Sequence, residues 1–332
     1  MTNIGISYNT SYILHKIHQQ IINMKKKMKF TEIAGLWKAD KRQYVKKSTL
    51  AAYSLLIINH LLPTFGDCTD ISENMVQEFV LTKISTDLSQ KSIKDILVVL
   101  KMILKFGAKH NMIKYQPIDI RFPPEKERKE TEVLSVTDHK RLMEYVKSNF
   151  TFANLGIYIC LSSGLRIGEI CALTWNDIDT ENGVIKISRT LQRIYVTDDT
   201  PRRHTELLID SAKTKNSIRE IPMTKELLRI IKPLKKVVNG SYFVLTNSIY
   251  PTEPRTYRNH YKKIMQELKM PYIKFHGLRH SFATRCIESR CDYKTVSVLL
   301  GHSNISTTLN LYVHPNMDQK KKCVEQMFKS LR

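Results

Sequence analysis

A segment that favours neither helix nor strand divides this sequence into a shorter and a longer part. Residues 113–132 contain Pro117, Pro123 and Pro124 and end in an almost unbroken charged run over 125–132. Proline removes a backbone donor and disrupts helices, while a charged run favours solvent. Because 332 residues are enough for two hydrophobic cores, we expect a linker here between two separately packed domains.

The part before this linker has the periodicity of helices only. Apolar residues recur at helical spacing from Phe30 to Leu61, a further helix is predicted to begin near Ser72, and residues 89–110 form a strongly amphipathic pattern. We therefore expect a compact helical domain with four main helices over 28–112. It follows a short N-terminal helix with a basic end over 1–27.

The part after the linker mixes two periodicities. Ser135 and Asp138 have the spacing of a helix-capping pair, and helical patterns dominate most of the remaining chain. Alternation over 184–191 and 206–222 predicts strands, with a turn at 213–216. The expected fold class is mainly α with a small antiparallel β-sheet in the second domain, an α+β domain over 133–332.

The charge of the chain points to a polyanionic partner. There are 53 Lys and Arg against 31 Asp and Glu, a net charge of +22, and both parts of the chain carry the excess. Neutralised phosphates release counterions and so bind basic surfaces. Nucleic acid is the leading candidate; the competing interpretation is a basic protein without such a role.

Several other classes are disfavoured. The most apolar stretch, 51–62, is short for a membrane span, and the N-terminus lacks the pattern of a secretory signal. We expect no membrane partner. The cysteines show no C-x-x-C pair and the histidines no H-E-x-x-H motif, which disfavours a zinc site and suits a reducing cytoplasm. We expect no metal and no cofactor.

Four short segments carry chemistry that becomes informative only when they are combined. Each residue alone has an ordinary interpretation as a surface cation, a core histidine or a core aromatic residue. The segments contain, in chain order, Arg166 and Glu169; Lys213; His276, Arg279 and His280; and His302 followed by Tyr312.

Together these residue types supply the parts of one reaction at a phosphodiester. Two guanidiniums can grip the non-bridging oxygens through forked hydrogen bonds. A tyrosine hydroxyl can attack phosphorus if a base or cationic site activates it, a lysine can protonate the departing oxygen, and imidazoles can move protons or donate hydrogen bonds. No metal is needed for this chemistry.

The motifs S-G-L-R-I-G-E, H-G-L-R-H-S-F-A-T and L-L-G-H, with Tyr312 ten residues after His302, resemble the tyrosine recombinase (phage integrase) family. The resemblance is close over about 133–315 and looser over the helical domain before it. It implies a site-specific DNA recombinase of a bacterial mobile element or prophage, which performs integration or excision through a 3′-phosphotyrosyl intermediate. It also implies a SAM-like helical domain and a two-domain, C-shaped clamp on double-stranded DNA.

The same resemblance implies a role for each matched residue. Arg166 and Arg279 would be the phosphate-gripping pair, and Tyr312 the nucleophile. Lys213, in the predicted turn, would be the general acid, although Lys215 lies two residues away. The remaining roles are proton acceptor for His276, hydrogen-bond donor to the scissile phosphate for His302, support of the basic residues for Glu169, and a structural role for His280.

The end of the chain and one departure from the family add further expectations. Val324, Met327, Phe328 and Leu331 form an apolar stripe at helical spacing. This helix either packs on its own domain or, as the resemblance implies, docks on a neighbouring protomer of a homotetramer on DNA. Many relatives have glycine where this chain has Arg290; a left-handed backbone there would cost about 1 kcal/mol.

Two other functions remain open at this stage. A type IB topoisomerase-like relaxing enzyme shares the chemistry but does not pair two sites, and a non-catalytic DNA-binding protein could keep the same fold. The expected location is the bacterial cytoplasm, on the nucleoid when bound, with a possible accessory directionality factor.

Overall fold

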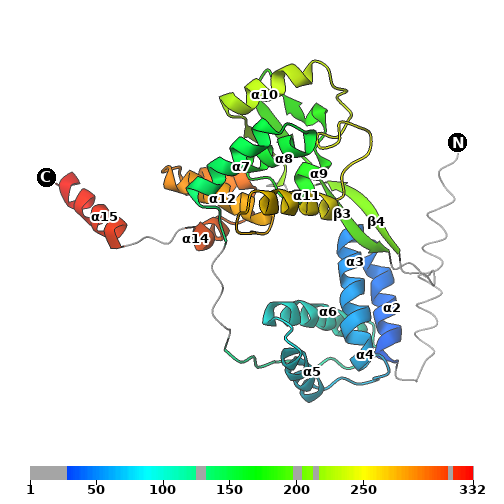
Figure 1. Cartoon of the computed structure of the whole chain (residues 1–332). Helices are drawn as coiled ribbons and strands as arrows, with labels where there is room; N and C mark the ends of the chain where they lie inside the picture. Colours follow the sequence, from blue (N-terminus) through cyan, green and yellow to red (C-terminus); the bar gives the residue numbers. More distant parts are fainter. Residues whose placement is uncertain (1–27, 125–131, 197–203, 212–216, 313–316, 332) are drawn as a thin grey trace. The chain divides into compact units, whose positions relative to one another are not determined.

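The computed structural model describes residues 28–124, 132–196, 204–211, 217–312 and 317–331. Packing divides the chain into two compact units (Figure 1). One unit comprises residues 1–127 with 194–206, and the other comprises 128–193 with 207–332. They are called the helical unit and the catalytic-type unit below. The predicted N-terminal helix over 1–27 lies outside the described residues.

The helical unit contains the helices that the periodicity predicts. Ser72 and Ser89 cap the last two of them by accepting hydrogen bonds from the backbone N–H groups of Met75 and Ser92. The second helix is continuous from α3 through a π-helical turn into α4. The elements are α2 (Phe30–Lys41), α3 (Lys47–Leu56), η1 (Ile57–Leu61), α4 (Leu62–Phe65), α5 (Glu73–Ser85) and α6 (Gln90–Lys109).

The continuous helix over 47–65 is long and apolar enough to cross a membrane by length and composition alone. In the structure it behaves as a core helix, because Ile57, Leu61 and Phe65 are buried against the other helices. The apolar stretch is therefore explained by the packing of the helical unit.

An extended segment after α6 lies against α5 and α6. Both the carbonyl and the N–H of Arg121 bond to the side-chain amide of Gln77, each at 3.1 Å, and Gln90 donates to the carbonyl of Pro123 at 2.8 Å. Ile118 of this segment is itself buried. Side-chain amides thus satisfy the backbone of a segment whose prolines prevent regular structure.

The catalytic-type unit is built on helices with a buried helix at its centre. In α8, all residues from Asn154 to Leu161 are buried, so this helix is covered on every side. Ser135 caps α7 as predicted. The helices are α7 (Val136–Ser148), α8 (Phe152–Ser163), α9 (Ile167–Ala172), η2 (Trp175–Asp177), α10 (Lys225–Lys235), α11 (Pro254–Glu267), α12 (His276–Glu288), α13 (Tyr293–Leu300), α14 (Ser306–Tyr312) and α15 (Met317–Ser330).

Two small antiparallel sheets complete this part of the chain. The first has the order β1-β2-β5, with Ile185 of β2 opposite Ile178 and Ile221. The second pairs β3 with β4. The strands are β1 (Ile178–Asp179), β2 (Val184–Ile187), β3 (Arg189–Val196), β4 (His204–Ser211) and β5 (Arg219–Pro222).

The strands confirm the predicted α+β class but divide the alternating segments differently. The sequence predicts one strand over 184–191 and one longer segment over 206–222. The structure breaks the first at Ser188, where the chain leaves one sheet for the other. Alternation cannot reveal such a break, because both strands keep the same period of two.

The turn between α12 and α13 has a left-handed backbone at Arg290, the conformation that glycine adopts without strain. Arg290 has φ 62°, and its N–H donates to the carbonyl of Ile287 at 2.9 Å. The chain therefore carries a non-glycine residue where L-residues are strained, at a cost of about 1 kcal/mol.

Candidate active site

Arg166 stands directly before α9 and not inside it. Gly164 ends α8 with φ 66°, a conformation natural to glycine, and Arg166 is extended as the N-cap of α9. Glu169, one turn later, accepts hydrogen bonds from the backbone N–H of Arg166 at 2.9 Å and from its Nη1 at 2.8 Å. The carboxylate therefore fixes both the backbone and the guanidinium of Arg166.

Arg279 lies in the first turn of α12 and is almost completely buried, with 1% of its surface exposed. Its Nη1 donates to the carbonyl of Gly164 at 3.0 Å and its Nη2 to that of Leu300 at 2.6 Å. Buried cations need such partners because transfer from water is costly. These contacts tie the end of α8 and the end of α13 to one guanidinium.

The two predicted phosphate-binding arginines converge on one place. Arg166 Nη2 donates to the carbonyl of Gly301 at 3.3 Å, next to the carbonyl of Leu300 that accepts from Arg279. The last carbonyls of a helix have no partner within the helix and carry partial negative charge. The end of α13 thus gathers both guanidiniums beside His302, the next residue in the chain.

His302 is oriented by a contact that the sequence did not predict. Its Nδ1 lies 2.8 Å from the hydroxyl of Thr308, which is completely buried in α14. The Nε2 atom is therefore the ring nitrogen left for a substrate. Desolvation, followed by the charges of Arg279 and Arg166, lowers the pKa of His302 to about 4.

His276 and His280 lie one turn apart on α12. Their rings are 4.7 Å apart at 90°. Desolvation by the surrounding protein, then His280, Arg279 and Arg166, lowers the pKa of His276 to about 4, although the residue remains exposed to solvent. In the free protein at neutral pH, His276 is therefore uncharged and able to accept a proton.

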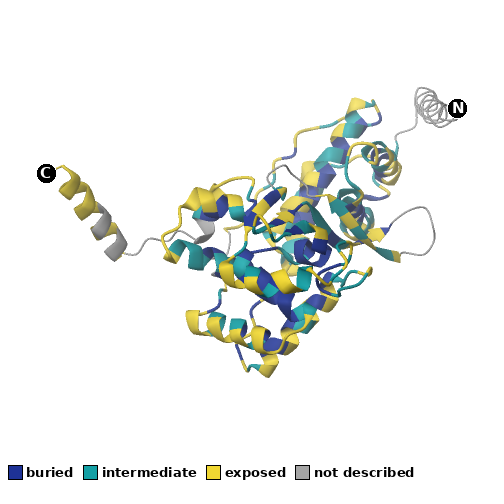
Figure 2. Ribbon diagram, turned by 90° about the horizontal axis from the view of Figure 1, so that it is seen from above, coloured by how far each residue is buried: buried dark blue, intermediate teal, exposed yellow. Residues whose placement is uncertain are grey.

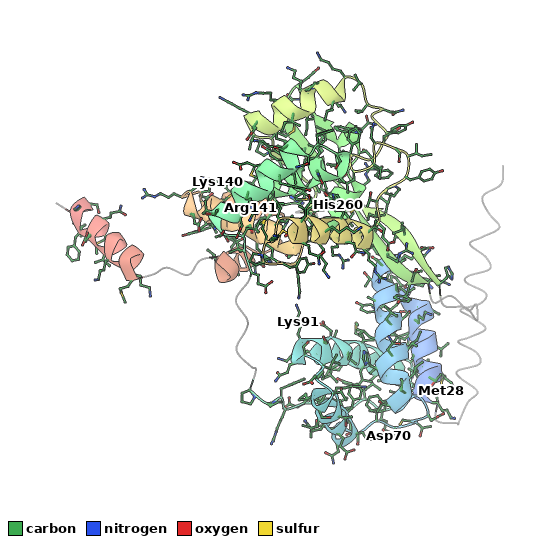
Figure 3. The ribbon with its side chains drawn as sticks, viewed as in Figure 1. Met28, Asp70, Lys91, Lys140, Arg141 and His260 are labelled. Carbon is green, nitrogen blue, oxygen red and sulfur yellow. The ribbon has the colours of Figure 1, made fainter. Side chains whose placement is uncertain are left out.

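A nearby histidine shows the contrast with a purely structural role. His260 of α11 (Figure 3) lies 2.8 Å from the side-chain oxygen of Asn154 and stacks on Tyr257 at 18°. No arginine acts on its pKa, which is lowered by desolvation and then by Lys263. The guanidiniums distinguish His276 and His302 from it.

Two of the predicted site residues are not placed. Lys213 lies outside the described residues. Tyr312 is the last residue of α14, ten residues after His302, and the description covers its backbone but not its side chain. The structure thus brings together Arg166, Glu169, His276, Arg279 and His302, and it does not test the positions of the Lys213 ammonium or the Tyr312 phenol.

Arg219, at the start of β5, is a site neighbour that the sequence interpretation missed. Its Nη1 and Nη2 donate to the two carboxylate oxygens of Glu169 at 3.0 and 2.9 Å. A signal was present: alternation in Arg219–Pro222 puts Arg219 on the same buried face as Ile221. A cation on a core face requires a buried anion, and Glu169 is the acidic residue of the matched motif.

The Glu169 carboxylate is ionised in spite of its burial. Burial by itself raises the pKa of Glu169, but the hydrogen bond and charge of Arg219, together with Arg166, outweigh it and bring the pKa to about 2. The cluster of Arg166, Glu169 and Arg219 therefore keeps a net positive charge at neutral pH, which suits an anionic substrate. Over the described ranges, no group of three or more His, Cys, Asp or Glu is arranged to hold a metal ion.

The chain thus has a helical unit and an α+β unit in which Arg166, Arg279 and His302 lie together at the end of α13. The phage integrase family model matches residues 132–319, and the phage integrase N-terminal SAM-like domain matches residues 29–84. The chain belongs to the phage integrase family and is a tyrosine site-specific recombinase of the mobile-element type.

Relatives and one solved structure agree with this membership. A tyrosine recombinase XerC-like protein of Caldanaerobacter subterraneus subsp. tengcongensis is 29% identical over 95% of this chain and 81% of its own length. The transposase from transposon Tn916 of Enterococcus faecalis is 30% identical, over 56% of this chain and 48% of the transposase. The Tn1549 transposon integrase, solved in complex with a circular intermediate DNA, has the same fold with a TM-score of 0.72 at 23% identity, over 90% and 99% of the two chains.

Proposed function

We propose that this recombinase cuts and rejoins DNA of a mobile element by attack of Tyr312 on the scissile phosphate. The phenol oxygen forms a bond to phosphorus, the bond to the 5′ oxygen breaks, and a 3′-phosphotyrosine and a 5′ hydroxyl result. A 5′ hydroxyl from a partner strand then reverses the step. One phosphoester replaces another, so the step needs no ATP.

In this proposal Arg166 and Arg279 grip the non-bridging oxygens. The observation that carries it is their convergence on the adjacent carbonyls of Gly301 and Leu300, directly before His302. Fixed guanidiniums stabilise charge that develops in the transition state and pay no reorganisation at that moment. His302 donates from Nε2 to the same phosphate, and Glu169 keeps Arg166 in place.

Proton transfer is assigned to His276 and Lys213. His276 accepts the phenol proton; the lowered pKa of its imidazole keeps the ring unprotonated in the free protein. The ammonium of Lys213 donates a proton to the departing 5′ oxygen. A bound phosphate would raise the pKa of both His276 and His302, because an anion favours the protonated ring. DNA binding should therefore be accompanied by proton uptake near pH 5–6. This pH lies between the pKa of about 4 in the free protein and the ordinary histidine pKa of 6.5.

The wider assembly is also a proposal. The domains would be a helical DNA-binding domain over 28–112, a linker over 113–132 and a catalytic domain over 133–332, closing as a clamp on the duplex. In α15, Val324 and Phe328 are 53% and 62% exposed, an apolar face suited to docking on a neighbouring protomer of a homotetramer. The enzyme would act in the bacterial cytoplasm, on the nucleoid, with an accessory factor setting direction.

The experiment begins by expressing the protein beside its flanking DNA and sequencing the junctions that form, which defines the site. A nicked duplex with that site is then incubated with the wild type and with Tyr312→Phe. We expect a covalent adduct only with the wild type, and equal retardation of the DNA in gels. A wild type that binds the site but forms no adduct would support the non-catalytic alternative.

Removal of α15 separates recombination from relaxation. Because the exposed face of α15 is assigned to a neighbouring protomer, a variant ending after residue 316 should still form the adduct but lose strand exchange between two sites. A topoisomerase-like enzyme would keep its full relaxing activity in this variant and would show no exchange in either form.

A further inference from the structure

Arg219 is a buried cation whose guanidinium is bonded to the protein on all sides. Its side chain is 4% exposed. Besides the two bonds to Glu169, its Nε donates to the carbonyl of Leu299 at 2.7 Å and its Nη1 to that of Ser217 at 3.2 Å. All three guanidinium nitrogens of Arg219 thus bond to acceptors of the protein itself.

The contact with Leu299 completes a pattern at the end of α13. Three successive carbonyls, those of Leu299, Leu300 and Gly301, accept hydrogen bonds from Arg219, Arg279 and Arg166, in that order. These are the carbonyls that a helix end leaves without internal partners. Arg219 therefore bonds to the carbonyl next to the two that accept from Arg279 and Arg166.

The contact with Glu169 links Arg219 to Arg166 through one carboxylate. Oε1 accepts from Nη1 of both arginines, and Oε2 accepts from Arg219 and from the backbone N–H of Arg166. Without Arg219, a buried carboxylate would keep only the contacts to Arg166, and the burial cost would favour movement or protonation. Arg166 would then lose its fixed acceptor.

We infer that Arg219 is a positioning residue for strand cleavage: it sets Arg166, through Glu169, and the chain leading to His302, through Leu299, at the scissile phosphate. This inference rests on the proposed function. It assigns no contact between Arg219 and DNA. The defect caused by its loss should therefore be a weaker grip on the charged phosphate oxygens.

The test uses variants of the full chain. Arg219→Met removes the charge. Arg219→Lys keeps a positive charge beside the buried carboxylate, which protects the fold. The lysine ammonium cannot bond to Glu169 and to the Leu299 carbonyl at the same time. Arg189→Met is the matched control: Arg189 pairs with Asp177 at 2.7 Å and bonds to Thr174 in the same unit, without bonds to the end of α13.

The readout is the single-turnover rate of adduct formation on nicked site DNA, measured with the scissile phosphate and with a neutral methylphosphonate in its place. Thermal melting and DNA retardation are measured beside it. We expect both Arg219 variants to bind DNA normally and to slow cleavage of the phosphate about 100-fold, as a small misplacement of reacting groups does. Because a methylphosphonate has less charge to neutralise, the gap to the wild type should narrow to about threefold or less.

Arg166→Ala separates the two levels of the proposal. If the rate of Arg166→Ala falls below that of the wild type by the same factor on methylphosphonate DNA as on phosphate DNA, the phosphate-gripping role itself is wrong. Arg219 does not act through Arg166 if the rate loss of Arg166→Ala is smaller on methylphosphonate DNA while the rate loss of Arg219→Lys is the same on both substrates. Wild-type rates for Arg219→Lys and Arg219→Met on phosphate DNA would also overturn the inference, as would an equal loss in Arg189→Met.

Discussion

The two units of this protein place their charges differently. In the described part of the helical unit, the buried polar residues are two serines, Ser48 and Ser54, and the core is otherwise apolar. The catalytic-type unit buries Glu169, Arg219 and Arg279. Both units have an apolar core, with buried residues drawn dark blue in Figure 2, but among the described residues the buried charges lie in the second unit.

This difference indicates which unit holds the catalytic residues. Burying charge is costly unless each group is paired, and such pairs are weak evidence for stability. A cation that attracts a polyanion without taking part in chemistry can stay on the surface, and Lys91 of α6 is exposed (Figure 3). A unit that must stabilise a transition state has to fix its cations in place.

The largest expected effect compares a buried with an exposed cation. Arg279→Ala should slow adduct formation at saturating protein by at least about 100-fold, because it removes one grip on the phosphate and leaves the Leu300 and Gly164 carbonyls unsatisfied. Lys91→Ala should leave that rate unchanged, weaken retardation of DNA and reduce its salt dependence by about one ion. Equal losses of rate in Arg279→Ala and Lys91→Ala would show that buried and exposed cations do not differ in their contribution to cleavage.

The next effect concerns conservative substitutions. Glu169→Gln keeps the volume but leaves the buried guanidinium of Arg219 and the partly exposed one of Arg166 around a neutral group, and we expect a loss of about 3–5 kcal/mol in the free energy of unfolding. Leu100→Met in the helical unit should cost less than about 1.5 kcal/mol. Leu161→Met in the other apolar core is the control, and denaturant titration measures all three. A cost for Leu161→Met as large as that of Glu169→Gln would show that the whole unit is intolerant, not its charged cluster.

The strongest pH dependence of stability should come from the catalytic-type unit, where the pKa values of His276 and His302 are both lowered to about 4; His60 of the helical unit also has a lowered pKa. The pKa of His302 is lowered to about 4, so between the ordinary value of 6.5 and 4 the unfolded chain binds more protons than the folded one. Stability is therefore full above pH 6.5 and is lost as the pH falls toward 4. In His302→Gln, the melting temperature should fall by a few degrees less than in the wild type between pH 6.5 and 4. An equal fall in both proteins would show that other groups cause the pH dependence.

The smallest effect compares two left-handed residues. Arg290→Gly relieves a φ of 62° in the catalytic-type unit and should raise the free energy of unfolding by up to about 1 kcal/mol. Asn111→Gly, at φ 56° in the helical unit, should change it by much less, since asparagine tolerates this conformation. Thermal melting of both variants distinguishes them, and a larger gain for Asn111→Gly would reverse the expected order.

Much of this protein follows from local sequence. Serines at helix starts, apolar residues at helical spacing and glycine at the end of α8 act over a few residues, so the helices of both units appear where the pattern predicts them. The matched motifs likewise selected Arg166, Arg279 and His302 before any geometry was known, because their chemistry is legible from residue type and order.

Only the tertiary structure decided how those residues are held. Arg219 meets Glu169 across 50 positions of the chain, and Arg166 meets Gly301 across 135. The row of three carbonyls at the end of α13 and the break between β2 and β3 leave no periodic trace. Such contacts depend on how whole elements pack, and packing is set by the fit of many side chains at once, which short-range patterns do not contain.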